Sequence, residues 1–220
     1  MFTSSAFGPK PLIFDYKKMM WASLDDCVWS GPDCIKLTTK LAPLYPESRK
    51  FFVEYLGVRN ALSKTLIHEL SHLHIPDPEN ISAEVLTSVK DILFALNNAL
   101  IQNPGKKFPE TVEKFLKSKR VWPCRYIGLA PVALVDLTQS FFVPDHPLLL
   151  QLLHTKEDCG FPILDVQSEE VNAVKRLLLA MRLEGRSLSL SKKETVSATD
   201  TSDPADDLTE DLRKRAQALF

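Results

Sequence analysis

Glycine is scarce in this chain of 220 residues, and each of its seven glycines stands alone in the sequence. A loop that wraps around a phosphate needs clustered glycines, because its backbone must approach the ligand closely and adopt positive φ angles. The isolated glycines therefore exclude a nucleotide-binding G-x-G-x-x-G or G-x-x-x-x-G-K-[ST] loop. The G-x-S-x-G turn that carries the nucleophile of α/β-hydrolases is also missing.

Closely spaced cysteines, excess charge and long apolar runs are missing as well. The four cysteines contain no C-x-x-C pair, which favours buried thiols in a reducing compartment over a disulfide framework. The net charge of -1 provides no general attraction to nucleic acid or to an anionic membrane. No apolar run approaches the roughly 20 residues of a membrane helix, and the N-terminus does not resemble a secretory signal. We therefore expect an intracellular protein, cytoplasmic or nuclear, without nucleic-acid or membrane partners.

Prolines, glycines and capping residues predict the helices of the first half. One helix begins at Pro46 and ends before Gly57, with proline in the first turn and glycine just beyond the last. A second is expected from Asn60, as its cap, to about His74. A third covers residues 82–102, where apolar side chains recur at helical spacing. A shorter fourth follows Pro109.

The pattern changes after residue 118. The runs RVWPCR, ALVDL, FFVPD and PILDV are short and β-prone, whereas HPLLLQLLH and SEEVNAVKRLLLAMRL have helical spacing, with Ser168 as a cap of the latter. The sequence therefore predicts an α+β fold with a loose N-terminus over residues 1–11 and a module over 12–186. Within the module we expect residues 12–118 to be helical, and residues 119–186 to combine a small mixed sheet with helices.

The C-terminal part differs in composition from this module. Residues 187–207 are polar and rich in serine and threonine, which predicts a flexible linker. Residues 208–220, LTEDLRKRAQALF, resume a helical pattern without a C-terminal cap, so we interpret them as the start of a truncated helix. From this organisation we expect either a fragment of a larger protein or a truncated gene model.

The segment HELSHLH contains H-E-x-x-H, the zinc-binding pattern of many metallopeptidases. In that chemistry His68 and His72 would bind zinc, and Glu69 would be the general base that activates water. The extended form of the motif requires a further glycine and histidine, but Ile75 and Pro78 occupy those positions. The other candidates for a third ligand are Glu79, Glu84, His146 and His154.

Helical geometry favours a different interpretation of the same segment. Four leucines share one arc of about 80° on this helix: Leu62, Leu66, Leu70 and Leu73. His68 lies about 155° and His72 about 115° from the centre of this arc, so both point towards solvent or a flank. We favour an exposed helix face that carries two histidines, and keep a zinc-dependent hydrolase as the alternative.

The three tryptophans, Trp21, Trp29 and Trp122, are expected in the core or at contacts between subdomains. Asp25 and Asp26 are interpreted as turn residues rather than as an acid–base pair.

Several stretches together resemble large fungal proteins of the sacsin and No-Vein type: SLDDCVWSGP, LAPLYPESRKFFVEYLGV, KTLIHELSHL, FPILDVQSEEVNAVKRLLLAMRLEGRSLS and LTEDLRKRAQALF. Those proteins carry a GHKL-type ATPase domain near the N-terminus, followed by a long helical and mixed region. The likeness covers most of residues 12–220 in order. It implies that this chain matches the region beyond the ATPase, lacks the ATPase itself and carries no catalytic residue of that family. It also implies that the zinc pattern is a local substitution in an amphipathic helix.

We therefore predict a non-catalytic interaction or relay module of a larger ATPase-containing protein. Its expected partners are proteins or the ATPase region of the parent protein, and it needs no cofactor. In the alternative, a zinc-dependent hydrolase or peptidase would use His68 and His72 as ligands and Glu69 as catalyst, with zinc as cofactor.

Overall fold

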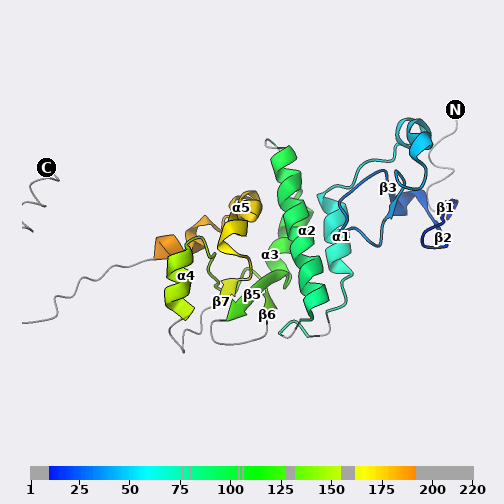
Figure 1. The fold of residues 1–220 in the computed structure, drawn as a ribbon. Coiled ribbons are helices and arrows are strands. Elements are labelled where there is room, and N and C mark those ends of the chain that lie inside the picture. Colours follow the sequence, from blue (N-terminus) through cyan, green and yellow to red (C-terminus); the bar gives the residue numbers. More distant parts are fainter. Residues whose placement is uncertain are drawn as a thin grey trace, which may run out of the picture.

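The computed structural model describes residues 10–191, apart from positions 76, 80, 104, 106, 127–131 and 155–161. Short strands come first in this part of the chain, three successive α-helices follow, and strands and helices are mixed in the second half, so the predicted α+β class is confirmed (Figure 1). Most of the predicted loose N-terminus, the linker from residue 192 on and the predicted helix over 208–220 lie outside the described residues. No helix in the described part is both long and apolar enough to cross a membrane.

Short strands occupy the start of the module, where helix was expected from residue 12 on. Strands β1 (Ile13–Asp15) and β2 (Met20–Ala22) form an antiparallel hairpin. After the 3-10 turn η2 (Leu24–Asp26), strands β3 (Cys27–Val28) and β4 (Thr39–Lys40) form a parallel pair.

The turn of the hairpin explains why no helix forms there. The carboxylate of Asp15 accepts hydrogen bonds from the backbone N–H groups of Lys17 and Lys18, at 3.0 and 3.1 Å. Met19 adopts a positive φ of 53°, which a helix does not tolerate. Side-chain acceptors of this kind compete with helical hydrogen bonds and favour turns.

The predicted helix after Pro46 is confirmed, although its hydrogen-bond pattern is unusual. It consists of a 3-10 turn, η3 (Pro46–Ser48), followed by a π-helical segment, η4 (Lys50–Tyr55). Gly57 ends it with a φ of 75°, the left-handed conformation that glycine favours. This segment and the strands enclose a small core of eight buried residues: Ile13, Ala22, Cys27, Trp29, Leu41, Phe52, Leu56 and Val58.

Three helices follow, α1 (Ser63–Ser71), α2 (Ala83–Gln102) and α3 (Glu110–Ser118). The helix predicted over residues 82–102 is confirmed as α2, and the hydroxyl of Ser82 caps it by accepting the N–H of Val85 at 3.3 Å. The predicted start of α1 is wrong: the side-chain oxygen of Asn60 accepts the hydroxyl of Ser30 at 2.9 Å and does not cap the helix.

The second half contains an antiparallel sheet in the order β6–β5–β7, with β5 (Trp122–Tyr126) between β6 (Val132–Val135) and β7 (Pro162–Leu164). Helix α4 (Pro147–His154) precedes β7. The turn η5 (Ser168–Glu170) and helix α5 (Val171–Ala180) follow it. These elements lie where the sequence predicted them.

Three details of this half differ from the predictions. The β-prone run FFVPD forms isolated β-bridges at Phe142 and Val143 instead of a strand. Gln167 rather than Ser168 precedes the first helical turn, and its N–H donates to the Glu170 carboxylate at 3.1 Å. After the turn η6 (Glu184–Arg186), residues predicted as linker form the 3-10 turn η7 (Leu188–Ser191). Leu188 is buried, and its N–H donates to the carbonyl of Val143 at 3.1 Å, so the packed structure extends beyond residue 187.

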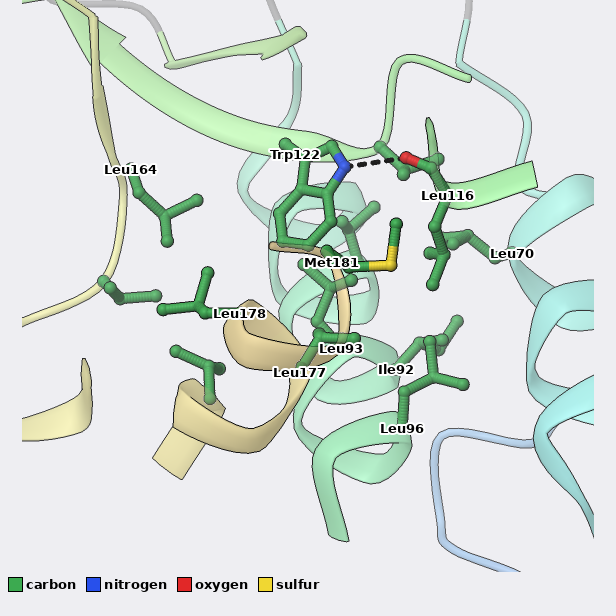
Figure 2. Close-up of a cluster of buried hydrophobic side chains, with 14 of the residues drawn as sticks. Leu70, Ile92, Leu93, Leu96, Leu116, Trp122, Leu164, Leu177, Leu178 and Met181 are labelled. Carbon is green, nitrogen blue, oxygen red and sulfur yellow. Dashed lines mark hydrogen bonds between the residues drawn. The ribbon is translucent and has the colours of Figure 1, made fainter. Parts of the chain in front are cut away.

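The main core lies between α2, α5 and the three-stranded sheet, and α1 packs against α2 on the side away from α5 (Figures 1 and 2). Helix α3 contacts α1 and adds the buried Val112 and Leu116 to this core. Trp122 is fully buried, and its indole N–H donates to the carbonyl of Leu116 at 2.9 Å. The buried amide of Asn97 in α2 accepts the N–H of Leu177 in α5 at 3.0 Å. Helix α2 thus packs against both α5 and α1.

Candidate functional site

Glu69 of the H-E-x-x-H pattern points into the protein. Its side chain is 4% exposed, and its two carboxylate oxygens accept backbone N–H groups from Lys36, Leu37 and Thr38 at 2.9–3.1 Å. These donors belong to the loop that leads into β4. Glu69 therefore fastens helix α1 to the N-terminal strands across more than 30 residues of sequence.

The surroundings of Glu69 keep it ionised. Burial alone would raise the pKa of its carboxyl group, but the backbone N–H donors of Leu37, Thr38 and Lys36 lower the pKa below its ordinary value. A carboxylate that is negative and already bound to three donors stabilises a loop well. It is poorly placed to accept a proton from a metal-bound water, which a general base must contact directly.

The two histidines of the pattern lie on the surface, as the helical angles predicted. His68 and His72 are both exposed, and their ring centroids are 4.3 Å apart. His72 follows the last residue of α1, and its Nδ1 lies 2.9 Å from the carbonyl oxygen of His68. The two histidines of the pattern are thus on the surface, whereas the glutamate between them is buried.

The four candidates for a third zinc ligand have other positions. Glu79 and Glu84 are exposed, and Glu84 lies in the first turn of α2, where the helix dipole favours an acidic residue. The Nδ1 atom of His146 accepts the N–H of Leu149 at 3.3 Å near the start of α4. The side chain of His154 is outside the described atoms. Among the described residues, no group of three or more His, Cys, Asp or Glu side chains could hold a metal ion.

A surface hollow of about 490 Å³ lies between the β1–β2 hairpin and α1. Thirteen residues line it: Met20, Trp21, Ala22, Asp25, Asp26, Val28, Leu37, Thr38, Thr39, Lys64, Thr65, His68 and His72. We call it the α1 hollow. One wall comes from the hairpin and the loop that Glu69 holds, and the other comes from α1.

The hairpin wall exposes large apolar side chains. Trp29 and Trp122 are buried, as expected of tryptophans in the core or at contacts between subdomains, but Trp21 is 60% exposed and is not a core residue. Met20 and Leu37 are about half exposed beside Trp21 in the same hollow. Successive side chains of a strand point to opposite faces. Ala22 faces the core, so the preceding Trp21 points away from it.

The exposed segment is held in a defined shape. The ring of Trp21 packs on that of Phe14 across the hairpin, with centroids 5.1 Å apart. The ammonium group of Lys18 donates to the carbonyl oxygens of Lys36 and Leu37, which ties the hairpin turn to the loop held by Glu69. The apolar wall is therefore held in place by the Phe14 ring and by the hydrogen bonds of Lys18.

Residues 64–191 match a family described as a domain of unknown function, DUF8348. Because the match covers more than half of the chain, the chain belongs to this family. No curated protein and no solved structure matches the chain. The matched residues include nearly all of α1, so the α1 hollow combines one wall from the family domain with one from residues that precede it.

The helical angles could have revealed the special position of Glu69. On the same wheel that places the histidines outside, Glu69 lies only about 60° from the centre of the leucine arc. An acidic residue beside an apolar stripe requires hydrogen-bond donors when the stripe is buried. The identity of those donors, three N–H groups from residues 36–38, depends on the tertiary fold and has no signal in the local sequence.

Proposed function

We propose that this chain is a non-catalytic interaction or relay module of a larger, intracellular ATPase-containing protein of the sacsin and No-Vein type. The α1 hollow is its partner-binding surface in this proposal. The observation that supports it is the apolar wall formed by Met20, Trp21 and Leu37, which is exposed and yet held in place by polar contacts.

The chemistry of this wall suits protein binding. Tryptophan and methionine are enriched in protein interfaces, where a large side chain is covered by the partner and excludes water. Grouped exposed apolar residues are uncommon on a monomer without such a role. Because Glu69 and Lys18 order the wall beforehand, little conformational entropy is lost when a partner binds.

The position of Glu69 supports the non-catalytic part of the proposal. A zinc-dependent hydrolase would need this carboxylate beside a metal-bound water, whereas it is buried under the loop of residues 36–38. The zinc hydrolase remains a separate prediction, which hydrolysis and metal measurements can test.

A reconstitution experiment tests the relay role. The GHKL-type ATPase region of the parent protein is expressed alone and with this chain, and both association and ATP turnover are measured. We expect the chain to bind the ATPase region and to change its turnover. If neither association nor turnover responds to the chain, the relay role is wrong.

A further inference from the structure

We propose that His68 and His72 form a two-imidazole binding site for a divalent transition-metal ion, such as Zn²⁺ or Ni²⁺, at the edge of the α1 hollow. The inference does not depend on the proposed protein-binding function. It concerns reversible metal binding, without hydrolysis.

The spacing and exposure of the pair carry the proposal. The two side chains are one helical turn apart on the same flank of α1, where residues four apart are neighbours. Their ring centroids are 4.3 Å apart, and both rings reach solvent. Small rotations of two exposed side chains suffice for both rings to turn one nitrogen towards a shared ion.

The hydrogen bonds of His72 determine which of its ring nitrogens can bind a metal ion. The Nδ1 atom of His72 lies 2.9 Å from the carbonyl oxygen of His68 and 3.1 Å from the hydroxyl oxygen of Ser71. Because a carbonyl oxygen can only accept, the shorter contact assigns the proton to Nδ1. The hydroxyl of Ser71 donates to the same carbonyl at 2.8 Å. The lone pair of His72 is therefore on Nε2. An Nδ1–H that donates to a backbone carbonyl also orients many metal-binding histidines.

The hollow around the pair contains charges of both signs. Its charged lining residues are Asp25, Asp26 and Lys64, which together carry one net negative charge when the histidines are neutral. Imidazole nitrogen is a suitable ligand for zinc, copper and nickel, whereas Mg²⁺ and Ca²⁺ prefer oxygen. Water completes the coordination of an ion held by two nitrogens.

The same geometry separates this site from a catalytic zinc centre. The base position of the pattern, Glu69, faces the loop of residues 36–38 and makes no contribution at the histidine face. The structure thus assigns metal binding to the histidines and loop attachment to the glutamate between them.

Calorimetric titration of the untagged full-length chain with ZnCl₂ and, separately, NiCl₂ tests the site. We expect one ion per chain and a dissociation constant that rises at least about tenfold in His68→Ala and in His72→Ala. His74→Ala is the matched control, because His74 is exposed on the same segment but does not line the hollow.

Circular dichroism shows whether each variant has kept its helices, which separates loss of a ligand from loss of fold. Equal affinity in the wild type, His68→Ala and His72→Ala would overturn the proposal. Equal loss of affinity in His74→Ala would overturn it as well. Neither result would affect the proposed binding of a protein partner, which the reconstitution experiment measures separately.

Discussion

Replacement of Glu69 by glutamine separates the structural role of this residue from a catalytic one. The substitution keeps the size of the side chain but removes its charge and one acceptor oxygen. The new amide NH₂ group would face backbone N–H groups of the loop over residues 36–38, which are donors as well. We therefore expect the loop to detach from α1 and the protein to lose stability.

The expected magnitude follows from the contacts. A hydrogen bond to a charged group contributes about 1.5–3 kcal/mol, and three backbone N–H groups donate to Glu69. The loop is partly exposed, so water replaces some of these bonds in the variant, and glutamine retains one acceptor. A decrease of about 2–4 kcal/mol in the free energy of unfolding results, which is a large part of the stability of an ordinary domain.

Urea unfolding at pH 7 measures this decrease, with Glu54→Gln as the matched control. Glu54 is exposed, so its replacement should change the free energy of unfolding by less than about 0.5 kcal/mol. The effect also depends on pH. Folding lowers the pKa of Glu69 below its ordinary value of 4.5. The stabilisation that the carboxylate provides is therefore fully present above pH 4.5, and it is lost as the pH falls through the lower pKa of the folded state. The difference between the wild type and Glu69→Gln should therefore shrink below pH 4.5.

Two outcomes would refute this reasoning. The first is a Glu69→Gln variant as stable as the wild type at pH 7, which would mean that the loop is held by other contacts. The second is a peptide-hydrolysing activity of the wild type that the variant loses while its stability is unchanged. That result would support the zinc-dependent hydrolase.

Two further predictions concern stability. Asp165 is 7% exposed, and its carboxylate contacts the ammonium of Lys90 at 2.7 Å and the guanidinium of Arg125 at 2.8 Å. Asp165→Asn should lower the free energy of unfolding in urea by about 1–3 kcal/mol, and not by more, since both cations can still reach water. An unchanged unfolding midpoint would contradict the structural role of these ion pairs. Gly57→Ala should cost about 1–2 kcal/mol through its positive φ alone, because a methyl group there meets no atom within 4 Å, whereas Gly185→Ala, without positive φ, should cost less in the same assay.

Elements with strong local signals were predictable from the sequence. Helix α2 has a serine cap and a long apolar repeat, and both are visible without any knowledge of the fold. The proline and glycine that flank the helix at residues 46–57 act in the same local way. The three strands of the second sheet were found because prolines and polar turns separate short β-prone runs.

The features that depend on tertiary contacts were not predictable in the same way. The β1–β2 hairpin has no glycine in its turn, and it relies on the Asp15 carboxylate and on the strained φ of Met19. Trp21 looks like a core residue by its chemistry, and only the packing of the hairpin shows that it faces outward. The H-E-x-x-H pattern indicated a metal site, but the direction of Glu69 follows from a loop 30 residues earlier.

Isothermal titration of this chain against the ATPase region of the parent protein, with Trp21→Ala beside the wild type, tests the central claim most directly. Trp21 is exposed, so its replacement should leave the fold intact but weaken binding at least about tenfold, as expected for an aromatic anchor. Tyr55→Ala, which removes an equally exposed aromatic residue outside the α1 hollow, should bind like the wild type. Equal binding by Trp21→Ala and the wild type would contradict the assignment of the hollow as the partner-binding surface.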